Sequence, residues 1–147
     1  MEIVRVTDEK GLVINEALLV RAEPIHRHLR PQIPENYLVR MKEVFATGAE
    51  MAVAMEGDEL CGVVTFRVTT NTMTGKKITN EDLVADPNTR SKGVGKALMD
   101  FVKQEGLARG CVSIELESGT AREQAHKFYF REGFTIKTFG FKQPLVK

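Results

Sequence analysis

The chain has 147 residues, of which 42% are hydrophobic and 28% are charged. This length and composition suit one folded domain with a real core, so we expect a single domain over residues 1–147. With 21 basic and 20 acidic residues, the formal charge of +1 argues against a nucleic-acid binder driven by bulk charge. Two cysteines are too few for a disulfide framework, and no signal peptide or membrane-length apolar run is evident. The expected location is the cytoplasm, with no membrane partner and no nucleic-acid partner.

Four helices are expected, over about residues 11–20, 35–45, 92–109 and 122–131. Asp8 can cap the first helix, and Pro34 suits the first turn of the second. Three prolines between residues 24 and 34 predict that no long helix crosses that stretch. Gly110 and Gly133 are expected to end the third and fourth helices.

Six strands are expected, over residues 1–6, 51–55, 60–68, 77–85, 111–117 and 134–145. A turn at residues 56–59 joins two of them as a hairpin. The element order is β-α-α-β-β-β-α-β-α-β. Hairpins in the middle predict antiparallel pairing there, and the two later helices are crossovers between strands. The expected fold is α/β (α+β), with a mixed, mostly antiparallel central sheet flanked by helices.

Residues 83–98 read as an apolar strand, a turn, a glycine-bearing loop and then a helix. The first N–H groups of a helix lack intrahelical partners, and the helix dipole favours an anion there. Gly93 and Gly95 leave the backbone open to a ligand, and basic side chains add positive charge at Arg90, Lys92 and Lys96. A phosphate or pyrophosphate ligand is therefore predicted. The loop is not a Walker A motif, because Ala97 follows Lys96, and it lacks the third glycine of a dinucleotide-binding fingerprint.

The loop resembles the coenzyme A loop of the GNAT acyltransferases, Arg/Gln-x-x-Gly-x-Gly/Ala, which Arg90 to Gly95 match. Residues 125–134 resemble the second signature of that family, Ala-x-x-Phe-Tyr-x-x-x-Gly-Phe. The resemblance is firm over about residues 77–141, and the first seventy residues match in element order only. It implies a GNAT-like fold and acetyl-CoA as the cosubstrate, with no metal.

In this family, acyl-coenzyme A lies in a gap where two strands splay apart beside the loop. The resemblance places the pantetheine arm on the backbone of Leu83, Val84 and Ala85, where an N–H could stabilise the oxyanion. It places the pyrophosphate on the backbone N–H groups of residues 91–96. The implied cofactor-binding residues of the loop are Arg90, Ser91, Lys92, Gly93, Val94, Gly95 and Lys96.

The resemblance also implies that Tyr129 donates a proton to the coenzyme A thiolate as it leaves. An amine acceptor is mostly ammonium at neutral pH, so a base must accept its proton. Three carboxylates border the expected cleft: Glu81 and Asp82, which should face opposite sides of their strand, and Glu117 on the next strand. Glu81 is slightly favoured because Leu83 and Ala85 should share its face.

The expected function is transfer of an acetyl group from acetyl-CoA to a primary amine of a small molecule or peptide. The alternatives are a catalytically silent acetyl-CoA-binding module and a phosphate or nucleotide sensor of another class. The charged stretch with His26, Arg27, His28 and Arg30 is expected to be a solvated lid, with recognition of an acceptor's carboxylate or phosphate as the alternative. An apolar closing strand would leave an edge to cover, which allows a homodimer through residues 134–141.

Overall fold

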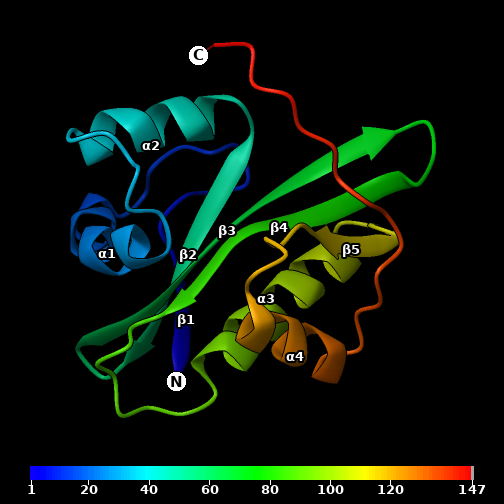
Figure 1. Cartoon of the computed structure of the whole chain (residues 1–147). Coiled ribbons are helices and arrows are strands. Elements are labelled where there is room, and N and C mark those ends of the chain that lie inside the picture. Colours follow the sequence, from blue (N-terminus) through cyan, green and yellow to red (C-terminus); the bar gives the residue numbers. More distant parts are fainter. Residues whose placement is uncertain (147) are drawn as a thin grey trace. The chain divides into compact units, whose positions relative to one another are not determined.

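The computed structural model describes residues 1–146 and divides into two compact units, Met1–Leu116 and Glu117–Lys147. We describe each unit by itself (Figure 1). The first unit contains β1 (Glu2–Arg5), α1 (Glu16–Leu29), α2 (Tyr37–Ala46), β2 (Ala49–Glu56), β3 (Glu59–Asn71), β4 (Gly75–Ala85), α3 (Val94–Ala108) and β5 (Ser113–Leu116). The second unit contains α4 (Glu123–Arg131).

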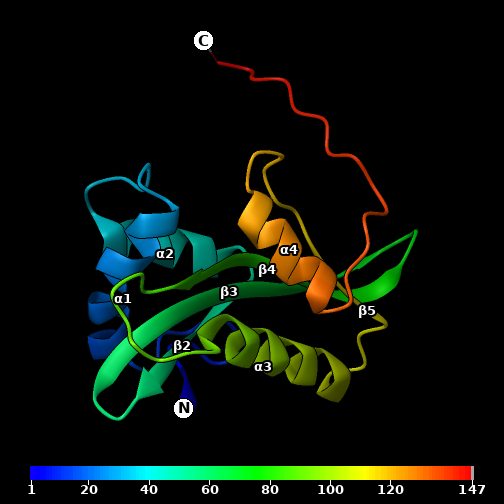
Figure 2. The ribbon, with the colours of Figure 1, turned by 60° about the horizontal axis from the view of Figure 1, so that its bottom comes forward.

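The five strands form one sheet in the order β1-β2-β3-β4-β5. The first three pairings are antiparallel, and β4 pairs with β5 in parallel. Within the first unit, α1 and α2 cover one face of this sheet and α3 covers the other (Figure 2). The expected mixed, mostly antiparallel sheet flanked by helices is therefore confirmed.

The central strands are buried on both faces. Along β2, Met51 and Val53 pack in the core cluster with α1 and α2, whereas Ala52 and Ala54 pack in the cluster with α3. A strand covered on both faces needs no polar positions, which explains why β2 shows no alternation of apolar and polar residues. Beside it, the fully buried thiol of Cys61 on β3 donates to the Ala54 carbonyl oxygen at 3.3 Å.

The first helix begins later than the sequence pattern predicts. Asn15 is its N-cap, and the Asn15 side chain accepts a hydrogen bond from the Leu18 N–H at 3.1 Å. The Asp8 carboxylate instead accepts from two N–H groups of the preceding turn. The predicted helix over 11–20 with an Asp8 cap is therefore wrong in its bounds and its cap. Both residues are good caps, and the apolar face that begins at Leu18 decides between them.

α1 continues through Pro24 but ends at Leu29, so no helix crosses the whole stretch from residue 24 to residue 34, as predicted, although Pro24 itself lies inside a helix. A proline in a helix removes one backbone hydrogen bond and crowds the preceding turn. The helix continues because the residues around Pro24 bury an apolar face, with Leu19 and Ala22 before it and Ile25 after it. Tertiary burial therefore outweighs the local cost of the proline.

The second helix is close to its predicted position. Asn36 is its N-cap and accepts from the Val39 N–H at 3.2 Å, so Pro34 precedes the helix instead of lying in its first turn. Tyr37, Met41 and Phe45 are buried, as expected from their spacing.

The second unit lacks the predicted closing strand. Gly133, with φ of 90°, follows the end of α4, and residues 134–146 form neither strand nor helix. A strand exists only where another strand supplies hydrogen-bond partners, and the described part of the second unit contains no other strand. The element order is thus confirmed through α4, and the final strand over 134–145 is wrong. Among residues 1–146, no helix has the length and apolar character needed to cross a bilayer.

Candidate active site

One edge of β4 becomes open partway along the strand. β4 pairs with β3 along nearly its whole length, but with β5 only from Lys77 to Asn80. Within the first unit, residues 81–85 therefore have a strand neighbour on one side only. The N–H and C=O groups on the other side can bond a ligand that lies along the strand. This stretch includes the three residues expected to hold the pantetheine arm, Leu83, Val84 and Ala85.

A β-bulge interrupts β4 at Glu81. Across the ladder, Asp82 faces Thr65 and Asn80 faces Phe66, which leaves Glu81 as the extra residue. An extra residue shifts the alternation of side chains along the strand. Glu81 and Asp82 therefore both point toward the face covered by α1 and α2. The expectation that they face opposite sides is wrong.

The packing of the neighbouring residues agrees with this shift. Val84 belongs to the core cluster of α1 and α2, whereas Leu83 packs against the cluster of α3. Ala85 pairs with Gly62, where a Cβ would meet side chains of α3. Leu83 and Ala85 thus lie on the opposite face from Glu81, and the argument that favoured Glu81 for sharing their face does not hold.

Glu81 is held by an arginine of β3. Arg67 donates from Nε to the Glu81 carboxylate, and from Nη1 to the Thr47 carbonyl oxygen at 2.7 Å and the Thr47 hydroxyl at 3.1 Å. The Glu81 side chain is 34% exposed. The carboxylate is therefore fixed in position and still reaches solvent.

Asp82 is the centre of a hydrogen-bond network that joins α1, α2 and β4. Its carboxylate receives His26 Nε2 at 2.7 Å and Arg30 Nε at 2.8 Å. The other ring nitrogen of His26, Nδ1, lies 2.8 Å from the Tyr37 hydroxyl. His26 is 1% exposed and Tyr37 is 2% exposed, so these contacts lie inside the first unit.

The environment of this network shifts two pKa values. Burial raises the pKa of Asp82, but the hydrogen bonds and charges of His26 and Arg30 outweigh it, and the net pKa lies below its usual value. Burial, with the charges of Glu23 and Asp82, raises the pKa of Tyr37. Asp82 is thus an ionised acceptor and Tyr37 a neutral phenol. The two ring nitrogens of His26 thus serve different partners, with Nε2 donating to Asp82 and Nδ1 paired with the Tyr37 hydroxyl.

The loop between β4 and α3 begins with a turn. Asp86 closes it, since its carbonyl accepts from the Thr89 N–H at 3.1 Å and its carboxylate accepts from the Asn88 N–H at 2.9 Å. Gly93 is the N-cap of α3 in the left-handed conformation, with φ of 74°, and has no side chain to cap the helix. A Cβ at Gly93 would meet nothing within 4 Å. The first turn of α3 is therefore uncapped and accessible, as an anion site requires.

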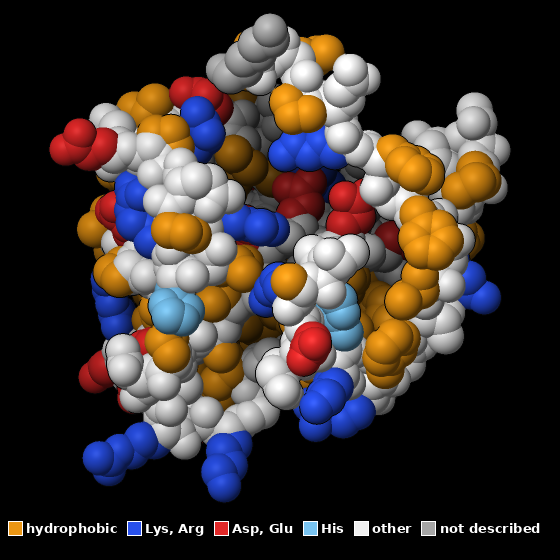
Figure 3. Space-filling view, in the orientation of Figure 1, with side chains coloured by type: hydrophobic (Ala, Val, Ile, Leu, Met, Phe, Trp, Pro, Cys, Tyr) orange, Lys and Arg blue, Asp and Glu red, His pale blue; other side chains and the backbone are white. Residues whose placement is uncertain are grey.

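The charge of this loop also suits an anion. Arg90 and Lys92 are exposed, and the first turn of α3 has no acidic residue. Basic side chains extend from the lower edge of the first unit, where this loop lies (Figure 3). The Ser91 N–H donates to the Thr89 hydroxyl at 3.2 Å, so it is less available than expected.

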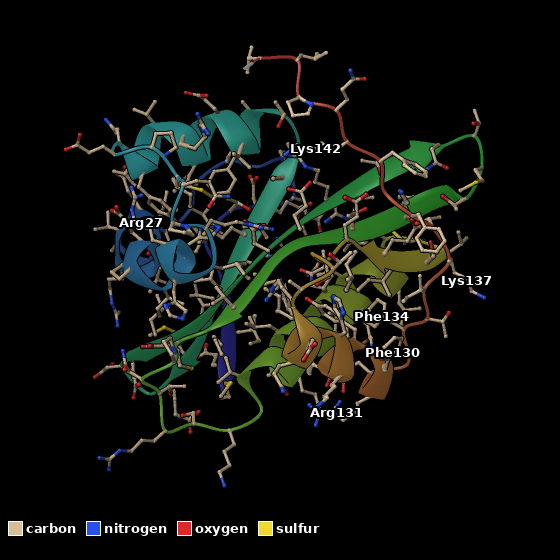
Figure 4. All side chains as sticks on the ribbon, viewed as in Figure 1. Arg27, Phe130, Arg131, Phe134, Lys137 and Lys142 are labelled. Atoms are coloured by element: carbon tan, nitrogen blue, oxygen red, sulfur yellow. The ribbon has the colours of Figure 1, made fainter. Side chains whose placement is uncertain are left out.

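Tyr129 is the one buried residue of α4 and lies in the second unit. Its ring makes edge-on contacts with Phe128 and Phe134, with centroids 5.7 Å and 6.0 Å apart. Figure 4 marks Phe134 after α4 and Phe130 on the helix itself. The aromatic contacts fix the orientation of the Tyr129 ring within the second unit.

Glu117 also belongs to the second unit and is exposed. A Cβ at Gly140 would lie 4.0 Å from its Oε1, so the terminal segment passes beside this carboxylate. His126 lies 2.8 Å from the Gly119 carbonyl oxygen and 3.1 Å from the Ser118 hydroxyl, contacts that tie α4 to its preceding loop. Glu81 and Asp82 thus come together in the first unit, and Tyr129 and Glu117 both occur in the second.

The charged stretch lies at the end of α1, with His26, Arg27 and His28 in the helix and Arg30 as its C-cap, and it is not the predicted solvated lid. Arg27, marked in Figure 4, donates to Glu23 and to the carbonyl oxygens of Ile33, Pro34 and Glu35. Its guanidinium therefore holds the α1–α2 connection together. Sequence reasoning missed the His26–Asp82–Tyr37 network. The one available signal was the helical spacing of His26 with Ala22 and Leu29, which places it on the apolar face.

Comparison with known proteins identifies the class of this site. The model of the acetyltransferase (GNAT) family matches residues 18–134. An uncharacterized N-acetyltransferase of Bacillus subtilis, YhdJ, is 33% identical over 128 residues, which cover 83% of this chain and 88% of the relative. The chain therefore belongs to the acetyltransferase (GNAT) family and is an acetyl-CoA-dependent N-acetyltransferase. The predicted family membership is confirmed.

One further relative and one solved structure of the same fold have more specific names. An aminoalkylphosphonate N-acetyltransferase of Salmonella typhimurium is 32% identical over 65 residues, or 44% of this chain and 42% of the relative. A crystal structure of aminoglycoside N-acetyltransferase AAC(6')-Iy in complex with CoA matches with a TM-score of 0.80 and 18% identity, over 99% of this chain and 95% of that one. The structural match shows the shared fold.

Proposed function

We propose that this enzyme moves the acetyl group from acetyl-CoA to a primary amine of a small molecule by direct attack, with a peptide amine as the alternative acceptor. One observation carries the proposal: the open edge of β4 leads directly into the uncapped N-terminus of α3. An extended amide-bearing arm fits the first feature, and a pyrophosphate fits the second. Acetyl-CoA combines both groups in one molecule.

In this proposal the backbone of Leu83, Val84 and Ala85 bonds the pantetheine amides and directs one N–H at the thioester carbonyl. The pyrophosphate lies on the N–H groups that start α3, from Val94 to Lys96. Arg90 and Lys92 add charge, and Gly93 permits the close approach. Ser91 contributes less through its N–H, because Thr89 already accepts it.

Glu81 is our proposed general base. It is fixed by Arg67 and partly exposed, so an acceptor ammonium or an ordered water can reach its carboxylate. Asp82 is less suited, because two charged or polar donors already occupy its carboxylate. Glu117 is the second candidate, since it is exposed at the start of the second unit.

Tyr129 is our proposed general acid, which protonates the sulfur of coenzyme A as the tetrahedral intermediate collapses. Glu81 belongs to the first compact unit and Tyr129 to the second, and we propose that both units belong to one acetyltransferase domain. The family match from residue 18 to residue 134 supports this, because it runs through both.

The acceptor is proposed to be a small amine, as the names of the aminoglycoside and aminoalkylphosphonate relatives suggest. Arg27 is not suited to bind an anionic group of the acceptor, because its guanidinium already donates to backbone carbonyl oxygens of the α1–α2 connection. We further propose a cytoplasmic location, supported by two free cysteines. A homodimer through residues 134–141 is supported by the exposure of Ile136, Phe139 and Phe141.

The test is release of free coenzyme A thiol from acetyl-CoA in the presence of amino acids, polyamines, aminoglycosides, aminoalkylphosphonates and short peptides. We expect release with at least one small amine. Tight binding of coenzyme A by calorimetry, with no release across the whole panel, would favour the alternative of a silent acetyl-CoA-binding module. Absence of binding would overturn the site itself.

A further inference from the structure

The network around Asp82 holds the part of β4 that the proposed thioester site uses. The carboxylate of Asp82 is bound by His26 in the last turn of α1 and by Arg30, the C-cap of that helix. Arg30 also donates from Nη2 to the carbonyl oxygen of Glu81 at 3.3 Å. The α1 helix thus contacts both residues of the bulge, immediately before Leu83.

The bulge requires such support because its own ladder is broken there. The Asp82 N–H donates to the Thr65 hydroxyl at 3.1 Å. Beyond Asn80 the strand has lost β5 as a neighbour within the first unit. A strand segment with one partner and a bulge has fewer backbone bonds to fix it than a central strand. The hydrogen bonds from His26 and Arg30 therefore hold this segment where backbone hydrogen bonds to a second neighbouring strand are missing.

We propose that His26 and Arg30 are positioning residues for acetyl transfer, which hold the Glu81–Asp82 bulge so that the following backbone is aligned for the acetyl-pantetheine arm. This inference rests on the proposed function. Neither residue touches the ligand in this scheme. They act through Asp82, and Tyr37 keeps the His26 ring oriented by occupying Nδ1.

Two amide substitutions at His26 separate this role from ordinary core packing. The amide nitrogen of His26→Gln reaches the place of Nε2 and can still donate to Asp82. The amide of His26→Asn reaches only the place of Nδ1, so it keeps the contact with Tyr37 and loses Asp82. Both variants replace a buried ring by an amide, so a packing role alone predicts similar behaviour for the two.

The measurement is the calorimetric Kd of each variant for acetyl-CoA and for 3′-phospho-ADP, which carries the phosphates but no pantetheine arm. His26→Asn should weaken acetyl-CoA binding about ten-fold, the loss of one or two aligned hydrogen bonds, and leave 3′-phospho-ADP unchanged. His26→Gln should keep both affinities within about two-fold of the wild type. Should His26→Asn fail to fold, Arg30→Met provides the same test, because the Arg30 side chain is 39% exposed and its replacement leaves the core intact.

Equal affinities for acetyl-CoA in His26→Asn, His26→Gln and wild type would overturn this inference alone. So would an unchanged acetyl-CoA affinity in Arg30→Met. Failure of the wild type to bind either ligand would instead overturn the proposed function, and the positioning role with it. The two failures are therefore distinguishable in one set of titrations.

Discussion

Gly93 is the residue whose backbone conformation most directly serves the proposed phosphate site. Its φ of 74° is strained for any residue with a Cβ, yet the space around it is empty. Sequence reasoning selected Gly93 for its lack of a side chain. The structure adds that the residue is the N-cap of α3, where a larger side chain would lie against a bound anion.

We expect Gly93→Glu to abolish coenzyme A binding, because it places bulk and negative charge against the pyrophosphate. Calorimetry with coenzyme A measures this. Gly57→Glu is the matched control, since Gly57 also has a positive φ, of 59°, and open space around it. The backbone strain should cost each variant about 1–2 kcal/mol of stability, and the control should bind normally. Retained binding by Gly93→Glu would contradict the loop assignment.

Tyr129 carries the prediction for the chemical step. Tyr129→Phe keeps the ring that packs between Phe128 and Phe134, so coenzyme A affinity and stability should change little. Transfer should slow by roughly 10²-fold or more, the range for a lost general acid. Steady-state thiol release under saturating acetyl-CoA measures it. An unchanged turnover would leave Tyr129 with a packing role only.

At the scale of elements, the link between α1 and β4 makes stability depend on pH. The folded-state pKa of Asp82 is lowered, so the folded protein binds fewer protons than the unfolded chain near the ordinary carboxyl pKa of about 3.9. The stabilisation by Asp82 is therefore present above that pH and is lost as the pH falls through the lower folded value.

Asp82→Asn should cost about 1.5–3 kcal/mol at pH 7, the range for hydrogen bonds to a charged group. The difference from wild type should begin to shrink as the pH falls below about 4, where the unfolded wild-type chain takes up the proton, and should vanish as the pH falls through the lower folded pKa of Asp82. Urea unfolding of both proteins at several pH values measures it. A difference that stays constant from pH 7 to pH 3 would contradict the assigned network.

The proline inside α1 gives a second prediction at this scale. Pro24 is exposed, so Pro24→Ala removes no core packing, and it restores a backbone donor inside the helix. We expect the free energy of unfolding to rise by about 1–3 kcal/mol. Urea denaturation measures the change, and an exposed alanine substitution elsewhere on α1, His28→Ala, serves as a control for general effects. A lower free energy of unfolding in Pro24→Ala would contradict this prediction, because it would mean that Pro24 stabilises α1.

The sequence predicted most elements because their signals are local: the glycines after α3 and α4, the hairpin turn at 56–59 and the spacing of Tyr37, Met41 and Phe45. The bulge at Glu81 gave no such signal. The bulge depends on the register between β3 and β4. Glu81 and Asp82 are both acidic, so no alternation of apolar and polar residues indicates which of them faces which side of the sheet. The sequence alone therefore could not predict that the side chains of Glu81 and Asp82 point to the same side of the sheet.

At the scale of the whole molecule, two short signatures correctly predicted the family. The closing strand predicted for residues 134–145 from their composition is absent. Residues 134–146 have strand-like composition, but a strand depends on a neighbour elsewhere in the fold. Phe134 packs against Tyr129, but the later apolar side chains of this segment remain exposed, with Phe139 at 83% and Phe141 at 97%.

A second copy of the chain is our proposed cover for this segment. Phe139→Ser combined with Phe141→Ser should convert the proposed dimer to a monomer, because it removes apolar area from the interface. Light scattering after gel filtration measures the mass of both proteins. A monomeric wild type at high micromolar concentration would contradict the proposed dimer.

The buried thiol on β3 has a consequence for how this molecule can be followed in solution. Burial, with the nearby carboxylates of Glu59 and Glu56, raises the pKa of Cys61, and the side chain is fully enclosed. A thiol in that state is nearly inert to disulfide reagents. The folded enzyme therefore exposes only Cys111, which is half-buried, to such a reagent. A second reactive sulfhydryl should therefore appear only when β2 and β3 separate and expose Cys61. The rate at which a disulfide reagent labels Cys61 then reports the rate at which this part of the sheet opens.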